Sequence, residues 1–143
     1  MMRLSRRQEQ LRTGMRWLMA VFYFVAGVIH LKSPGSFLPI VPDWVPMPLQ
    51  VVLLTGVAEI AGAIGLMIPR LRWLAGVGLA AYAVAVFPAN IKHAVDGVAI
   101  GGQVLGWGYH VPRLLFQPVF VWWALWAGRV IDWPFGQRAV AAR

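Results

Sequence analysis

The chain contains no cysteine among its 143 residues. This absence excludes disulfides, thiolate metal sites and dithiol redox chemistry within the chain. Acidic residues are scarce as well, with five Asp and Glu in total, and charged residues of both signs make up only 13% of the sequence, whereas hydrophobic residues make up 59%. So few charges cannot cover a soluble domain of this size, and we therefore expect much of the surface to face lipid.

Basic residues outnumber acidic ones, and the formal net charge is +8. Such an excess can serve nucleic-acid binding, but here the basic residues flank apolar blocks and form no stripe interleaved with aromatic residues. This distribution is typical of charges that orient a protein in a membrane. We therefore expect the lipid bilayer, and no nucleic acid, as a partner.

Four apolar blocks have about the length that a helix needs to cross the hydrocarbon core, roughly 20 residues. They predict transmembrane helices over residues 13–31, 48–68, 72–93 and 111–131, between a basic segment (1–12) and a tail (132–143). The predicted fold class is all-α, a single membrane domain built as an up-down-up-down bundle of four transmembrane helices. Pro88 is expected to kink the third of these.

Lysine and arginine beside the predicted helices indicate their orientation, because cationic loops stay in the cytoplasm. Only Lys32, Lys92 and Arg113 fall on one side, while the other side holds Arg3, Arg6, Arg7, Arg12, Arg16, Arg70, Arg72, Arg129, Arg138 and Arg143. Both termini are therefore predicted to be cytoplasmic, in a multi-pass protein of the inner (plasma) membrane. The two long loops, about 32–47 and 94–110, then face outward, and we expect these apolar segments to lie on the membrane surface or over the bundle mouth.

Six polar side chains stand in or beside the predicted membrane helices, where each unsatisfied group is costly. Glu59 lies near the middle of the second helix, on a stripe of small and polar residues that should face the bundle interior. The six residues all fall toward the outer ends of the helices, which predicts that they converge on one outward-opening pocket. These candidate ligand-binding residues are His30, Glu59, Asn90, His93, Arg113 and Gln117.

Two interpretations of this polar cluster remain open. In one, the cluster is a ligand or proton site, and Glu59 and His30 are the candidate catalytic groups that handle protons. In the other, Glu59 pairs with Arg113, and Asn90 and Gln117 only fix helix packing through hydrogen bonds. No two histidines share a short helical spacing with a carboxylate, so no metal site is predicted.

Several segments resemble the DoxX family of small bacterial and archaeal membrane proteins, and the similarity covers about residues 20–126. The order and spacing of the segments carry the resemblance more than any one of them does. They are Ala26-Gly27-Val28-Ile29-His30, Val41-Pro42-Asp43-Trp44-Val45-Pro46, Thr55-Gly56-Val57-Ala58-Glu59-Ile60-Ala61-Gly62, Val86-Phe87-Pro88-Ala89-Asn90-Ile91 and Arg113-Leu114-Leu115-Phe116-Gln117.

The resemblance implies a four-helix, redox-associated membrane protein, a component of a membrane oxidoreductase. We accordingly expect a subunit that binds a quinone or a similar amphiphile in the outer half of the bundle, beside other redox-complex subunits or further copies of the chain. Many relatives with a thiol-redox association use cysteines, and this chain has none. The alternatives are a non-catalytic membrane scaffold or assembly partner and, third, a small-solute transporter.

Overall fold

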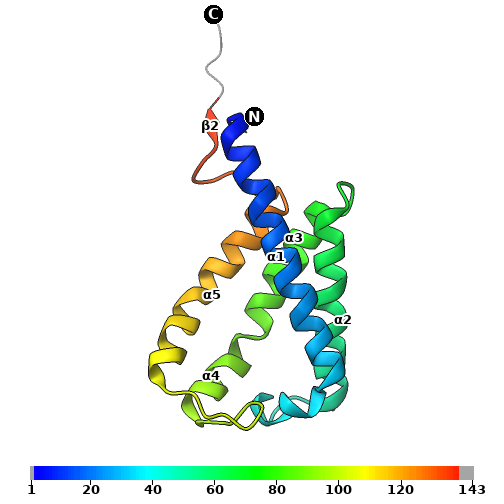
Figure 1. The fold of residues 1–143 in the computed structure, drawn as a ribbon, viewed down its shortest axis with the longest axis vertical. Coiled ribbons are helices and arrows are strands. Elements are labelled where there is room, and N and C mark those ends of the chain that lie inside the picture. Colours follow the sequence, from blue (N-terminus) through cyan, green and yellow to red (C-terminus); the bar gives the residue numbers. More distant parts are fainter. Residues whose placement is uncertain (1, 139–143) are drawn as a thin grey trace, which may run out of the picture.

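The structure is a computed structural model that describes residues 2–138, so residues 139–143 of the predicted tail lie outside the described part. This part is all-helical apart from one antiparallel pair of two-residue strands, β1 (Met2–Arg3) and β2 (Gln137–Arg138). The helices are α1 (Arg6–Lys32), α2 (Pro48–Met67), α3 (Arg72–Ala85), α4 (Phe87–Val95) and α5 (Trp107–Ala127). The predicted all-α class is thus confirmed (Figure 1).

Helix α1 begins seven residues before the predicted span, inside the segment 1–12 that was expected to precede it. Ser5 explains this start, because its hydroxyl accepts from the backbone N–H of Gln8 while the Gln8 side chain accepts from the backbone N–H of Ser5. Such a reciprocal cap satisfies backbone donors that a helix N-terminus leaves free. The basic segment is therefore mostly helical.

The predicted third membrane helix is divided into α3 and α4 at Val86. Pro88 has no N–H to donate to the carbonyl four residues earlier, so the break falls where the sequence predicted a kink. Pro88 then occupies the first turn of α4, a position that tolerates proline.

Three helical segments are long and apolar enough to cross a membrane: α1, α2 and the stretch Arg72–Val95 that contains α3 and α4. Helix α5 is not among them, since it contains His110, Arg113 and Gln117 as well as two prolines, which lower its mean hydropathy. It starts at Trp107, four residues before the predicted span, and continues through Pro112, which was expected at its N-terminus.

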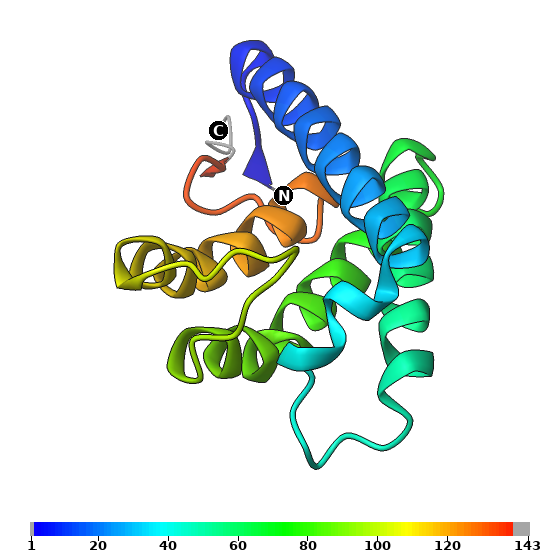
Figure 2. The ribbon, with the colours of Figure 1, turned by 60° about the horizontal axis from the view of Figure 1, so that its bottom comes forward.

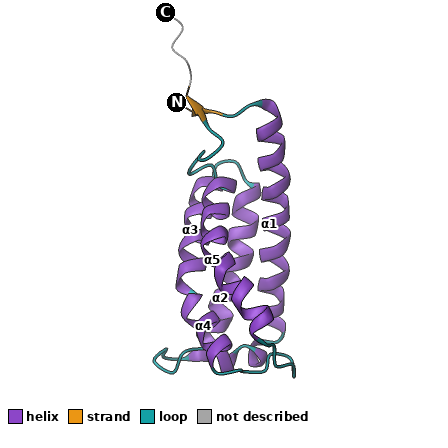
Figure 3. Cartoon of the chain, turned by 90° about the vertical axis from the view of Figure 1, so that its left-hand side faces the viewer, coloured by secondary structure: helices purple, strands orange, loops and turns teal. Residues whose placement is uncertain are grey.

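The helices run roughly along one axis, with loops gathered at both ends (Figure 3). Helix α1 packs mainly on α2, and α3 mainly on α5. Glycine permits the first contact, because a Cβ at Gly27 would lie 2.6 Å from the backbone oxygen of Gly56. Toward one end, α4 and α5 lie on one side of the molecule and α1 and α2 on the other (Figure 2).

The two ends of the bundle differ. At the basic end, which carries the N-terminus of α1 and the C-termini of α2 and α5, the helices enclose a core that includes Met19, Leu66 and Leu79. At the loop end, which carries residues 33–47 and 96–106, the same helices surround a cavity. Large apolar side chains such as Leu54 and Leu115 are exposed on the exterior, as expected of a surface that faces lipid.

Candidate functional site: a mostly apolar cavity at the loop end

A cavity of about 720 Å³ lies at the loop end of the bundle, bounded by all five helices and by residues 37–45 of the first long loop. Its volume falls within the range of small-molecule sites. Most of its lining residues are apolar, but the lining also includes five of the six sequence-predicted site residues: His30, Glu59, Asn90, Arg113 and Gln117. The sixth, His93, is buried behind Arg113 and does not line the cavity.

Glu59 is the carboxylate of the site and is only 4% exposed. Tyr82 of α3 donates a 2.7 Å hydrogen bond to its Oε1. The Nδ1 atom of His30 lies 3.0 Å from its Oε2, although Oε2 has no well-aligned hydrogen-bond donor among the described residues. This second oxygen is therefore only partly satisfied, in a setting where an unmet acceptor is costly.

His30 is held in place on two sides. Its Nδ1 lies 2.9 Å from the backbone oxygen of Ala26, one turn earlier in α1, and its ring stacks on Phe37 with centroids 3.9 Å apart. Phe37 belongs to the first long loop, between the 3₁₀ helices Pro34–Ser36 and Leu38–Ile40. That loop folds over the bundle mouth, one of the two placements that its apolar sequence predicted.

Arg113 supplies the positive charge on the opposite wall of the cavity. Its Nη1 donates to Nδ1 of His93 at 2.9 Å, and its guanidinium carbon lies 5.8 Å from the ring centre of Tyr109. Arg113 makes no ion pair with Glu59 in the described part of the chain, since the contacts of Glu59 are Tyr82 and His30. The second interpretation of the polar cluster paired Glu59 with Arg113, and this ion pair is therefore not formed.

Asn90 and Gln117 connect α4 to α5 beside the cavity. Asn90 Nδ2 donates to Gln117 Oε1 at 3.1 Å, and Gln117 Nε2 donates in turn to the backbone oxygen of Ala83, three residues before the break between α3 and α4. Both polar groups of Gln117 are thus engaged within the protein. Asn90 Oδ1 accepts no hydrogen bond from the described residues, and Asn90 is one of the residues that line the cavity.

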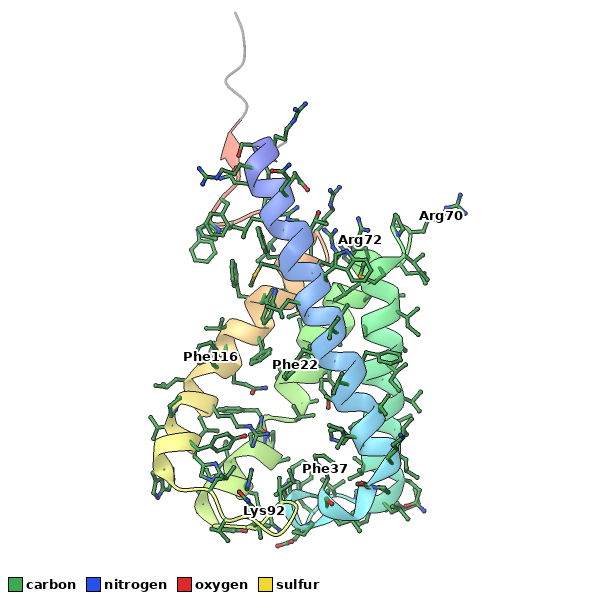
Figure 4. All side chains as sticks on the ribbon, in the orientation of Figure 1. Phe22, Phe37, Arg70, Arg72, Lys92 and Phe116 are labelled. Carbon is green, nitrogen blue, oxygen red and sulfur yellow. The ribbon has the colours of Figure 1, made fainter. Side chains whose placement is uncertain are left out.

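The cavity also reaches the outside of the bundle between α1 and α5. Phe22 of α1 and Phe116 of α5 both line it, and they are 49% and 55% exposed (Figure 4). Toward the basic end, Phe22 stands against Phe120, with ring centroids 5.5 Å apart. An apolar chain could therefore enter from the side while polar atoms inside receive a head group.

Sequence reasoning did not single out Tyr82 or Phe37. Tyr82 gave a signal that could have been used, because it is the one polar side chain in the apolar run from Leu74 to Val86. Phe37 gave none beyond its place in an apolar loop, since its stacking on His30 depends on how the loop returns over the bundle. His110 was also missed as a buried group: it is 2% exposed and its ring centroid lies 4.6 Å from that of His93.

Taken together, the fold and the cavity define a small helical protein with an apolar exterior and a polar cluster enclosed between its helices. Residues 19–128 match the family model described as a domain of unknown function, DUF8561, and the chain belongs to this family. No curated protein and no solved structure matches the chain.

Proposed function

We propose that the chain is a redox-associated membrane subunit that binds a quinone or a similar amphiphile in the cavity at the loop end. The single observation that carries this proposal is the shared cavity: polar side chains from separate helices line one mostly apolar space that opens sideways between α1 and α5. Apolar walls with a few converging polar groups are typical of small-molecule sites. The resemblance to the DoxX family is consistent with this function and remains part of the proposal.

In this proposal α5 is the fourth membrane-crossing helix. It packs against α3 and carries exposed apolar residues such as Leu115 and Val119, so it has to share the environment of the other three. An up-down-up-down bundle then puts the basic end, with both termini, in the cytoplasm and the loop end outside.

The ligand's head group would contact Arg113 on one wall of the cavity and Glu59 on the opposite wall. Arg113 and the amide of Asn90 offer hydrogen bonds to carbonyl or hydroxyl oxygens of a ring. Glu59 and His30, whose Oε2 and Nδ1 lie 3.0 Å apart, are the titratable groups that would give protons to the bound ring or take them from it.

Mass spectrometry of the intact protein, purified in mild detergent, tests this function. We expect a quinone or another isoprenoid amphiphile to co-purify, and a short-chain quinone to bind when added. Arg113→Gln should weaken that binding by about tenfold or more, since a charge-assisted hydrogen bond contributes about 1.5 to 3 kcal/mol.

Lys92→Gln is the matched control for this experiment. It removes one positive charge at the same end, but Lys92 lies outside the cavity and pairs with Asp43 at 2.5 Å. Its quinone affinity should equal that of the wild type. Protein that carries no amphiphile and binds no added quinone would exclude the proposed function.

A membrane scaffold is the second candidate, and the bonds of Gln117 favour it. Because both polar groups of that amide are used between helices, part of the polar cluster has a purely structural role. A scaffold would keep its partner and its fold when Arg113 is replaced and would show no quinone binding at all.

A further inference from the structure

Four arginines gather at the basic end of the bundle. Figure 4 shows one of them, Arg72, far along the helices from the cavity residue Phe37. Only two side-chain carboxylates accompany them, because the other three acids of the chain, Asp43, Glu59 and Asp96, lie toward the loop end. The cluster therefore has two more positive than negative side chains. Its members are Arg12, Arg16, Arg72 and Arg129, with Glu9 and Asp132.

Two of these arginines have their own acids. Arg12 donates to Asp132 at 2.6 Å and lies over the Trp126 ring, 5.1 Å from its centre. Arg129 donates to Glu9 at 2.8 Å. Arg16 and Arg72 have no carboxylate within 4.0 Å in the part of the chain that the structure describes.

Arg16 and Arg72 are instead fixed by the same kind of contact. The Nε of Arg16 donates at 2.8 Å to the backbone oxygen of Ala127 at the end of α5, and the Nε of Arg72 donates at 3.0 Å to that of Leu66 at the end of α2. A guanidinium has five N–H donors, and these contacts use only the Nε–H. They do not use the N–H groups of the two terminal nitrogens, Nη1 and Nη2. The Nη2 of Arg16 is buried and has no partner among residues 2–138.

The backbone contacts of the two arginines lie at the same end of α5. Helices α3 and α5 touch at Gly128, where a Cβ would lie 2.9 Å from the backbone oxygen of Arg72, and Gly128 directly follows the residue that Arg16 contacts. Two guanidiniums at one end of the bundle without a carboxylate of their own, one buried and one half-buried, favour an anion nearby.

We propose that Arg72 and Arg129 hold the phosphate group of an anionic phospholipid, with the buried Arg16 behind them adding its positive charge. Guanidinium groups match the geometry of phosphate oxygens. A lipid rather than free phosphate is favoured because Trp17 and Trp73, which follow Arg16 and Arg72 in the sequence, are each 57% exposed at this end of the bundle, where acyl chains could pack. This site is at the opposite end from the cavity and does not depend on the proposed function.

Native mass spectrometry of the full chain with equal amounts of phosphatidylglycerol and phosphatidylcholine tests this site. We expect phosphatidylglycerol to be retained preferentially and to raise the melting temperature. Arg72→Gln should weaken its binding by about fivefold, the effect of one basic residue at a lipid surface of about 1 kcal/mol. Arg72 is chosen because Arg16→Gln, at a buried position, affects folding as well.

Arg70→Gln is the matched control, because Arg70 is exposed at the same end and lies in the turn just before α3. It should leave phosphatidylglycerol binding unchanged. Equal retention of the two lipids, or an equal loss for the two variants, would overturn the proposal and leave only a general surface charge. If inorganic phosphate stabilises the protein as much as phosphatidylglycerol does, and if Arg72→Gln abolishes that stabilisation, the assignment to a lipid is overturned.

Discussion

Tyr82 on α3 donates its hydroxyl hydrogen to Oε1 of Glu59 on α2 over 2.7 Å. This hydrogen bond joins two neighbouring helices beside the cavity and holds the Glu59 carboxylate at the cavity wall. It also leaves Oε2 directed toward His30, 3.0 Å from its Nδ1. The paired His30 and Glu59 that we assign to proton handling therefore depend on a phenol that contributes no charge.

Replacing Tyr82 with phenylalanine should destabilise the folded protein by about 0.6 to 2 kcal/mol, because Glu59 Oε1 loses its donor in an apolar setting. Denaturation in mixed detergent measures this change. Tyr109→Phe is the control, since the hydroxyl of Tyr109 makes no hydrogen bond with the described residues and the side chain is 44% exposed. Equal stability of the two variants would show that the bond between Tyr82 and Glu59 contributes nothing.

Gly27→Ala should disturb the contact between α1 and α2. The added Cβ would meet the backbone oxygen of Gly56 at 2.6 Å and Ile60 Cγ1 at 2.7 Å, so the helices must separate at a cost of about 1 to 3 kcal/mol. Gly14→Ala, on the same helix, meets nothing within 4 Å and should stabilise α1 slightly through its higher helix propensity. Thermal unfolding compares the two, and a neutral Gly27→Ala would contradict the close packing described above.

Gln117→Leu should reduce stability more than it reduces ligand affinity. The substitution removes the bonds that tie α5 to Asn90 and to Ala83 near the break between α3 and α4, at a cost of about 0.6 to 1.7 kcal/mol. Quinone titration of the remaining folded protein should give nearly the wild-type affinity, unlike Arg113→Gln. A large loss of affinity at unchanged stability would instead make Gln117 a direct ligand contact.

The proposed orientation can be tested cleanly because the chain has no native cysteine. Gly35→Cys, in the first long loop, should react with a membrane-impermeant maleimide added to intact cells. Arg70→Cys, in the exposed turn at the basic end, should react only after the cells are opened. Labelling of both positions, or of Arg70→Cys alone, in intact cells would refute cytoplasmic termini with outward loops.

The location of the cavity was largely predictable from the sequence. Polar residues inside apolar runs are costly, so their shared displacement toward one end predicted that they meet, and five of the six line one cavity. The kink expected at Pro88 followed in the same direct way from its missing N–H, and the structure breaks the helix two residues earlier, at Val86.

The partners of these residues were not predictable. Helical spacing shows which face a side chain occupies, but the rotation of each helix and the order of helices around the bundle decide which neighbour it meets. Glu59 therefore meets Tyr82 and His30, where sequence reasoning suggested Arg113 as its partner. The start of α5 was misplaced for a local reason, since Pro112 is a common first helical residue yet lies one turn inside the helix here.

Photolabelling with an azidoquinone, followed by peptide mapping, tests most directly whether the cavity binds a quinone. We predict that the label falls on cavity residues of α1 and α5, such as Phe22 and Phe116, that excess unlabelled quinone suppresses it, and that Arg113→Gln reduces it while Lys92→Gln does not. Label distributed over lipid-facing residues such as Leu54 and Leu74, or label that unlabelled quinone leaves unchanged, would contradict a quinone site in this cavity.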